Sequence, residues 1–439
     1  MLSLMNSPSR ISLIVALVLM ATLFAGCGQV TPVPVGTATT VPNFTPAILT
    51  ATELPLVSSS TSTLTPSLPV SSAPDGLRMA YIIDGNLYFQ ESSKSPVQLT
   101  DKGDDWNVLF FSEDGERVFF FRDAIRHDLY SINVDGTQEQ ALVTKDLLAA
   151  FGSDYDKSTT PCEPVLVPHT HFLIFRTCSH PDELTTIYNS DLFIADTNAN
   201  QVKNLFPREQ GGTFYVSPNG SMLALDRLGH IDILSIDGKV VHSKVITYAI
   251  SEPVPLSPYV YWTSDSKELV AALPINTFYD TSQSPTYAIW RYSLDTGEKM
   301  HISLNPPPMS NEPMWVSPYG DWITYNNRDE QSFYLGNLRE GGALPYEIAL
   351  PYAWSQDNVH FLYAVPQSGG SDLYLAAVNG SSVYVGKGEF MSWLNASRYI
   401  FFVNQTFIMG EIDGKPLPIL AGNTQHLYSN ANIIFTYQP

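Results

Sequence analysis

The sequence predicts an all-β protein in which small antiparallel sheets stack around a ring. From about Asp75 onward, short apolar runs alternate with polar residues, aromatic residues are dense, and turns such as Asp114-Gly115 recur. Turn signals at intervals of about 8–12 residues between short apolar runs are typical of all-β domains. A helical period is visible only over the short segment 145–151. We therefore expect residues 75–439 to form short strands.

One unit recurs along this domain: a small hydroxyl residue, a tight turn, an apolar strand, and a second strand that often begins with Asp-Leu and an aromatic residue. The clearest copy contains the turn Ser112–Gly115, the strand Val118–Phe121 and the triplet Asp128–Tyr130. Further copies begin at Val216, Trp262, Val316, Trp354 and Trp393. Ser or Asp with Gly forms a hairpin turn, and alternating apolar residues give each sheet two faces to bury. Such sheets must pack against neighbours, which a ring provides.

These turns and strands resemble the repeat of TolB-type, WD-like β-propellers. The resemblance rests on the turn Ser217–Gly220, on Asp372-Leu373-Tyr374, and on the opening copy, which starts at Pro74-Asp75-Gly76 and ends at Leu99-Thr100. It covers about residues 72–437 and implies a β-propeller of four-stranded blades. It implies no particular function, because propellers host many unrelated activities.

The number of turns predicts eight blades, with seven as the alternative. The equivalent turn falls near Asp75, Asp114, His169, Asn219, Asp265, Tyr319, Asp357, Ala396 and Ala431. Nine turns enclose eight intervals of about 44 residues, and about 40–45 residues is a usual blade length. The apolar run Ile433–Phe435 follows the last turn and begins a unit that the chain does not finish. We expect this C-terminal run to pair with the incomplete first unit and close the ring, which removes two free sheet edges.

The first 26 residues resemble the signal peptide of a bacterial lipoprotein. Arg10 precedes an uncharged run from Ile11 to Phe24, which is shorter than the roughly 20 apolar residues that span a bilayer. Ala25, Gly26 and Cys27 follow and resemble a lipobox, although Phe24 stands where Leu is usual. The resemblance implies cleavage before Cys27, a diacylglycerol on its thiol, and an anchor on the outer face of a bacterial membrane, at the cell surface or in the periplasm.

Residues 27–74 are expected to comprise the lipidated cysteine and a disordered stalk. The segment 28–74 contains eight prolines, many Thr and Ser residues, and a single charge at Glu53. A segment of this composition buries too little surface to offset its ordering entropy. The expected domains are therefore a signal peptide (1–26), a stalk (27–74) and a propeller (75–439).

The composition argues against nucleic acid as a partner. The net charge is −20, from 43 acidic and 23 basic residues. Phosphate binding requires a basic surface, and anionic lipid repels an acidic protein body. Besides Cys27, the chain has two cysteines, Cys162 and Cys178. An even pair in an exported chain predicts a disulfide between them.

No residue pattern assigns a catalytic centre, a metal or a cofactor. The chain has no Gly-x-Ser-x-Gly motif, and paired carboxylates on separate blades would leave no sequence spacing. His169 and His171, near His180 and the two cysteines, are the best metal candidates. The repeat places both histidines in an exposed blade turn instead, and we expect no metal. The acidic loops at 101–105 and 154–156 do not match the spacing of known calcium motifs.

Two connections are longer than a blade requires, 145–161 and 274–285. Loops that protrude from a rigid scaffold often carry recognition. The second loop contains Phe278 and Tyr279, which we expect to form an exposed binding loop. The alternative is that this loop packs onto its own blade.

The anchor, the stalk, the closed repeat domain and the missing catalytic motif favour a non-enzymatic envelope protein. It would bind a protein, peptide or glycan through one face of the ring. A propeller hydrolase or lyase acting on surface polysaccharide is one alternative, which requires converging carboxylates with perturbed pKa values. A structural component of a multi-protein envelope complex is another.

Overall fold

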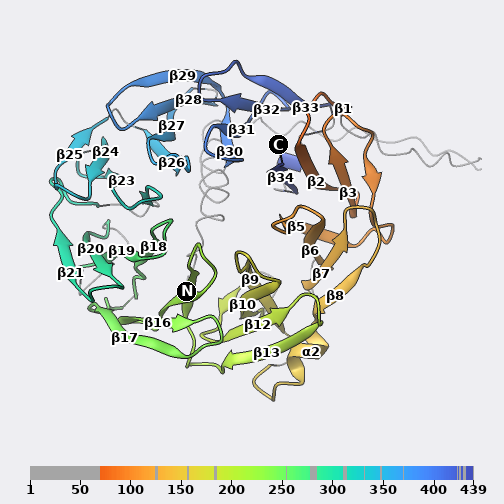
Figure 1. Ribbon diagram of the computed structural model, residues 1–439, viewed down its shortest axis with the longest axis horizontal. Helices are drawn as coiled ribbons and strands as arrows, with labels where there is room; N and C mark the ends of the chain where they lie inside the picture. Colours follow the sequence, from red (N-terminus) through yellow and green to blue (C-terminus); the bar gives the residue numbers. More distant parts are fainter. Residues whose placement is uncertain are drawn as a thin grey trace, which may run out of the picture.

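The computed structural model describes residues 70–439 apart from 124–126, 156–157, 182–184, 254, 277–283, 310–313, 331, 347–348, 369, 423, 425–426, 429–431 and 439. Over these residues the chain forms eight antiparallel sheets arranged in a ring, with a short helix, α2 (Lys145–Ala149), beside the ring (Figure 1). The predicted all-β propeller with eight blades is therefore confirmed.

The first four blades are numbered from the N-terminal end, with the innermost strand of each given first. Blade 1 contains β34 (Ile433–Tyr437), β2 (Leu77–Ile83), β3 (Asn86–Glu91) and β4 (Val97–Gln98). Blade 2 contains β5 (Asp105–Phe111), β6 (Arg117–Arg122), β7 (Asp128–Asn133) and β8 (Gln140–Val143). Blade 3 contains β9 (Thr159–Leu166), β10 (Phe172–Ser179), a third strand split into β11 (Ile187–Tyr188) and β12 (Leu192–Asp196), and β13 (Gln201–Phe206). Blade 4 contains β14 (Thr213–Val216), β15 (Met222–Asp226), β16 (His230–Ser235) and β17 (Val240–Thr247).

The remaining four blades follow the same order. Blade 5 contains β18 (Tyr259–Trp262), β19 (Glu268–Pro274), β20 (Tyr287–Ser293) and β21 (Lys299–Ile302). Blade 6 contains β22 (Trp315–Val316), β23 (Trp322–Asn327), β24 (Ser332–Asn337) and β25 (Ala343–Pro345). Blade 7 contains β26 (Leu350–Trp354), β27 (His360–Gln367), β28 (Gly370–Ala377) and β29 (Ser382–Lys387). Blade 8 contains β30 (Glu389–Trp393), β31 (Arg398–Val403), β32 (Thr406–Glu411), β33 (Leu417–Ala421) and a fifth, outermost strand, β1 (Val70–Ser71).

The alternation of apolar side chains along each strand explains the ring. On β6, Val118 and Phe120 pack into an apolar cluster shared with blade 1, whereas Phe119 and Phe121 pack into one shared with blade 3. Neighbouring residues of a strand point to opposite faces of its sheet, so each blade supplies apolar side chains to both neighbours. Eight such clusters occur, one at each junction between blades. The core is therefore a closed circle of interfaces.

Each end of the described chain forms a strand pairing that closes the ring. The C-terminal strand β34 pairs antiparallel with β2, as predicted, and forms the inner strand of blade 1. Ala431, near which the ninth turn is predicted, lies outside the described residues. At the rim, Val70 and Ser71 pair with Ala421 and Leu420 of β33. The predicted propeller boundary at Asp75 is therefore too late, because residues before it already belong to blade 8.

Two faces of the ring differ in the loops that they carry. The turn face carries the turns between first and second strands, such as 112–116. The connection face carries the links between blades, such as 144–158. In the turn of blade 2, the Ser112 hydroxyl accepts from the Arg117 N–H at 2.9 Å, and Gly115 has a φ of +70°. At the degenerate copy in blade 3, His169 adopts the same left-handed conformation, with a φ of +59°.

Helix α2 lies in the long link between blades 2 and 3. The Thr144 hydroxyl caps it by accepting from the Leu147 N–H at 3.2 Å, and Leu148 is buried against the blades. In the part of the chain that the structure describes, no helix has the length and apolar character needed to cross a membrane.

Candidate functional site

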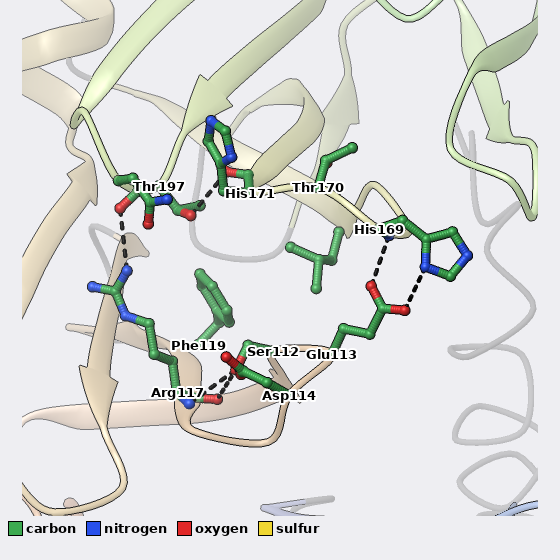
Figure 2. A pocket seen from close by; sticks show the side chains of 11 residues that line it. Ser112, Glu113, Asp114, Arg117, Phe119, His169, Thr170, His171 and Thr197 are labelled. Atoms are coloured by element: carbon green, nitrogen blue, oxygen red, sulfur yellow. Dashed lines mark hydrogen bonds and ion pairs between the residues drawn. The ribbon is translucent and has the colours of Figure 1, made fainter.

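A cavity of about 510 Å³ opens on the turn face between blades 2 and 3 (Figure 2). Small-molecule sites usually occupy about 300–1,000 Å³. We call this cavity the interblade slot. Its walls are Ser112, Glu113, Asp114, Arg117 and Phe119 from blade 2, and Leu166, His169, Thr170, His171, Thr197 and Asn198 from blade 3.

One side of the slot is bridged by Glu113 and His169. The His169 N–H donates to Oε2 of Glu113 at 2.7 Å, and its imidazole Nδ1 lies 2.6 Å from Oε1. Both side chains are more than half exposed, so the pair contributes little to stability. The pair spans the two blade turns, because each residue belongs to a different blade (Figure 2).

The opposite side of the slot is bridged by Arg117. Its Nη1 donates to the Thr197 carbonyl across the blade junction at 3.2 Å, and Nη2 donates to Oε1 of Gln140 at 3.3 Å. Its buried Nε has no hydrogen-bond partner among the described residues. Phe119 lies between the two bridges and supplies apolar surface (Figure 2). The slot thus combines a guanidinium, two imidazoles, two carboxylates and an aromatic ring.

His180 lies at the opposite end of β10 from the other two metal candidates, His169 and His171. His169 and His171 lie in the turn before this strand, as the repeat predicted, and His171 Nε2 lies 3.4 Å from Oδ2 of Asp196. His180 follows the strand on the connection face, where its Nε2 lies 3.1 Å from the Thr160 hydroxyl. In the described part of the chain, no group of three or more His, Cys, Asp or Glu side chains is arranged to hold a metal ion.

Cys162 and Cys178 lie on the paired strands β9 and β10. Their Sγ atoms are 2.05 Å apart and their Cα atoms 5.7 Å apart. Both side chains are buried, and a disulfide at this position ties the innermost strand of blade 3 to its neighbour.

Four carboxyl groups with raised pKa values lie at the connection-face ends of four blades. Burial raises the pKa of Asp105, Asp191, Asp226 and Glu389. Each accepts a hydrogen bond from its own blade or link. The donors are Thr100 and Arg122 for Asp105, Thr177 for Asp191, Tyr248 for Asp226, and Tyr428 for Glu389.

Asp226 has the most distinctive environment of the four. Burial raises its pKa to about 6, although the Tyr248 hydroxyl donates to Oδ1 at 2.6 Å. The phenol of Tyr215 lies within electrostatic range of the charged groups of Asp226, Arg176 and Glu163. Arg176 Nε donates to Oε2 of Glu163 at 2.7 Å, while Oε1 of Glu163 is buried without a partner among the described residues.

Several predicted site residues lie outside the described residues or have other roles. Cys27, Phe278 and Tyr279 are outside the described part of the chain. In the acidic loop at 101–105, the carboxylates of Asp104 and Asp105 lie 3.2 and 2.7 Å from Nε of Arg122. These two carboxylates therefore serve an ion pair of blade 2.

No protein-family model matches the chain, and no curated protein matches it. Among solved structures, it is similar to dipeptidyl peptidase 4 from Porphyromonas gingivalis, with a TM-score of 0.48, 14% identity, and coverage of 71% of this chain and 52% of that chain. This chain thus spans about half the length of that peptidase.

Two further solved structures are similar over comparable spans. They are an oligogalacturonate lyase from Vibrio parahaemolyticus (TM-score 0.44, 14% identity, 67% of this chain and 83% of that chain) and TolB from Acinetobacter baumannii (TM-score 0.32, 13% identity, 71% and 66%). At these identities a likeness reflects the fold alone.

Proposed function

We propose that this chain is a lipid-anchored protein of the bacterial cell envelope whose propeller binds another molecule through its connection face. Cys27 carries the lipid anchor, and the propeller recognises a protein, peptide or glycan. Of these ligands, the exposed side chains favour a protein or peptide.

The observation that carries this proposal is the set of exposed apolar side chains on the connection face. Trp106 at the start of β5 is 50% exposed, and Ile275 after β19 is 55% exposed. Further exposed members at this face are Ile187, Leu228 and Ile250. On the opposite face, the turns between first and second strands carry Tyr319 and Val359 as exposed apolar side chains among the described residues. The outer strands carry further ones near that face, among them Val240, Leu344, Val383 and Leu417. The connection-face members come from the neighbouring blades 2 to 5, and exposed apolar side chains on neighbouring blades are a candidate interaction surface.

Leu228 is held outward by its backbone. It occupies the hairpin turn between β15 and β16 with a φ of +51°, which is unfavourable for a branched side chain. A Cβ placed on the adjacent Gly229 would lie 3.4 Å from Cδ1 of Ile250, so Ile250 packs beside the same turn. Backbone strain that presents an apolar side chain to solvent is typical of recognition sites.

The carboxyl groups of this face support binding over hydrolysis. Catalysis of glycosidic cleavage requires an acid and a base that are free to reach the substrate. Asp226 has a suitable pKa, but it is 4% exposed and hydrogen-bonded to Tyr248. The other three carboxyls with raised pKa values are likewise bonded within their own blades or links.

The binding proposal is tested with the full-length protein extracted in mild detergent after crosslinking in cells. A variant in which Leu228, Ile250 and Ile275 are replaced by Ser should lose at least about nine-tenths of its captured partner, because apolar anchors dominate interfaces. The matched control replaces Tyr319 and Val359 on the turn face by Ser and should retain the partner. The opposite pattern would contradict the proposal. A partner that stays bound in constant ratio to both variants favours a structural component of a complex.

The anchor and the absence of catalysis need separate measurements. Mass spectrometry should find an acylated N-terminal Cys27, and Cys27→Ala should release the protein from membranes because the lipid is its expected attachment. An unacylated Cys27 would leave a secreted propeller. Polysaccharide turnover by the purified protein that is lost in Asp226→Asn would establish the hydrolase or lyase instead.

A further inference from the structure

The interblade slot contains two acidic side chains that are hydrogen-bonded within its walls. Both carboxylate oxygens of Glu113 interact with His169. Oδ1 of Asp114 accepts from the Ser112 hydroxyl at 2.5 Å and from the Glu116 N–H at 3.0 Å, and these bonds lower the pKa of Asp114. Both acids are therefore hydrogen-bonded to residues of the two blade turns.

Arg117, unlike Glu113, has no ionisable group of opposite charge in direct contact among the described residues. Its two hydrogen bonds end on neutral oxygens, those of Thr197 and Gln140, and its buried Nε is unpartnered among the described residues. Asp114 acts on it only at longer range, and burial lowers the pKa of Arg117. Partly burying a guanidinium without a carboxylate is unfavourable.

A second arginine on the same strand shows what Arg117 lacks. Arg122, at the other end of β6, has Asp105 and Glu139 at 2.7 Å each. The guanidinium is a rigid fork that matches a carboxylate in a bidentate pair. One strand thus holds an arginine paired with two carboxylates on the connection face and, beside a cavity on the turn face, an arginine without a carboxylate partner among the described residues.

We propose that the interblade slot binds a small organic carboxylate, with Arg117 as the residue that recognises the carboxylate group. The body of the ligand lies against Phe119 and Leu166, between the Glu113–His169 bridge and the Arg117–Thr197 bridge. The carboxylate supplies the charge that the two neutral oxygens do not. This site is on the turn face and is independent of the connection-face surface proposed above.

The test is isothermal titration calorimetry on the full-length protein in detergent, with sodium glucuronate and sodium butyrate as probes. Each carboxylate is compared with its amide, glucuronamide or butyramide, which keeps the shape but not the charge. At least one carboxylate should bind at least about tenfold more tightly than its amide, as expected for a charge-assisted pair. Binding of glucuronate alone identifies a sugar acid, and binding of butyrate alone identifies an aliphatic acid.

Two variants locate the site. Arg117→Gln should weaken carboxylate binding at least about tenfold, and Arg117→Lys should weaken it less because the charge remains while the fork is lost. The matched control is Arg398→Gln. Arg398 also begins the second strand of its blade, but its Nε lies 3.2 Å from Oε1 of its own carboxylate partner, Glu411.

Several outcomes would overturn the proposal. These are no heat of binding with either carboxylate, equal binding of carboxylate and amide, unchanged binding in the Arg117 variants, or an equal loss in Arg398→Gln. If Arg117→Gln does not fold, Arg117→Lys and the amide comparison on the unaltered protein still decide the question.

Discussion

The hydroxyl of Tyr248 donates a hydrogen bond of 2.6 Å to a carboxyl oxygen of Asp226, at the connection-face end of blade 4. Asp226 is buried, and this burial raises its pKa to about 6. The folded state therefore holds a proton on Asp226 more tightly than the unfolded chain does, where the pKa of Asp is about 3.9.

The first prediction concerns the pH dependence of stability. The stabilisation by protonated Asp226 is fully present below the unfolded pKa and is lost as the pH rises through about 6. Asp226→Asn still accepts from Tyr248 and cannot ionise. Its free energy of unfolding relative to wild type should therefore be higher at pH 7.5 than at pH 4 by about 3 kcal/mol. Urea unfolding at both pH values measures this, and the exposed Asp295→Asn serves as control.

The turns of neighbouring blades approach closely, which predicts unequal costs for two glycine substitutions. Gly220 has a φ of +68°, and an added Cβ would lie 2.1 Å from the Pro168 carbonyl of blade 3. Gly136 has a φ of +82° with nothing within 4 Å of the added atom. Gly136→Ala should cost about 1–2 kcal/mol of backbone strain alone, whereas Gly220→Ala should cost several kcal/mol more. Equal urea midpoints for the two variants would contradict this.

Tryptophans of the inner strands link adjacent blades. The Trp354 Nε1–H donates to the Trp315 carbonyl at 2.9 Å, and that of Trp393 donates to the Ala353 carbonyl at 2.9 Å. Trp354→Phe should therefore destabilise the protein by about 1 kcal/mol beyond the change in packing. Trp315→Phe is the matched control, because the buried Trp315 Nε1 has no partner among the described residues. Chemical unfolding should find the control less destabilised than Trp354→Phe.

The two strand pairings that close the ring, β34 with β2 and β1 with β33, should contribute unequally to the free energy of unfolding. Removing residues 433–439 takes away β34 and exposes the buried face of β2, including Leu77 and Tyr81. The loss should exceed about 5 kcal/mol, which is comparable to the whole stability of many domains. Replacing Val70 and Ser71 by Pro removes only the outer strand β1 and should cost about 1–2 kcal/mol. Circular dichroism melting curves distinguish the two.

The Cys162–Cys178 pair gives a prediction on oxidation. Non-reducing peptide mass spectrometry of protein purified from the envelope should recover the two cysteines in one crosslinked species. A disulfide between cysteines 16 positions apart along the chain stabilises by about 3 kcal/mol in the chain-entropy model. Replacing both cysteines by Ser should therefore lower the urea midpoint. Recovery of two free thiols from the native protein would contradict the prediction.

Repeated local signals made the fold predictable. In blades 2 to 7 the turn after the inner strand contains a residue in the left-handed conformation. In blade 4 this residue is Gly220, and the Ser217 hydroxyl supplies the acceptor of the turn. Even the degenerate copy at His169 forms a blade turn, because His169 takes the left-handed position. The terminal run Ile433–Phe435 was assigned to the first blade because an unfinished unit needs a partner, and β34 does pair with β2.

The candidate site was not predictable in the same way. Arg117 follows a turn whose sequence indicates only a structural role. Arg117 is distinguished by the fact that no carboxylate of the described residues pairs with its guanidinium. That distinction depends on Thr197, which lies on the next blade, 80 positions along the chain. The same holds for Val70 and Ser71, whose partners on β33 lie at the far end of the chain.

By itself, the sequence determined the all-β class, the blade repeat, the number of blades and the pairing of the chain ends, because turn chemistry and apolar alternation act between near neighbours or repeat at a fixed spacing. Only the tertiary structure decided which charges are compensated, which apolar side chains remain exposed and where a cavity opens. Those properties depend on the contacts between blades, and these contacts join residues whose separation along the chain carries no signal of its own.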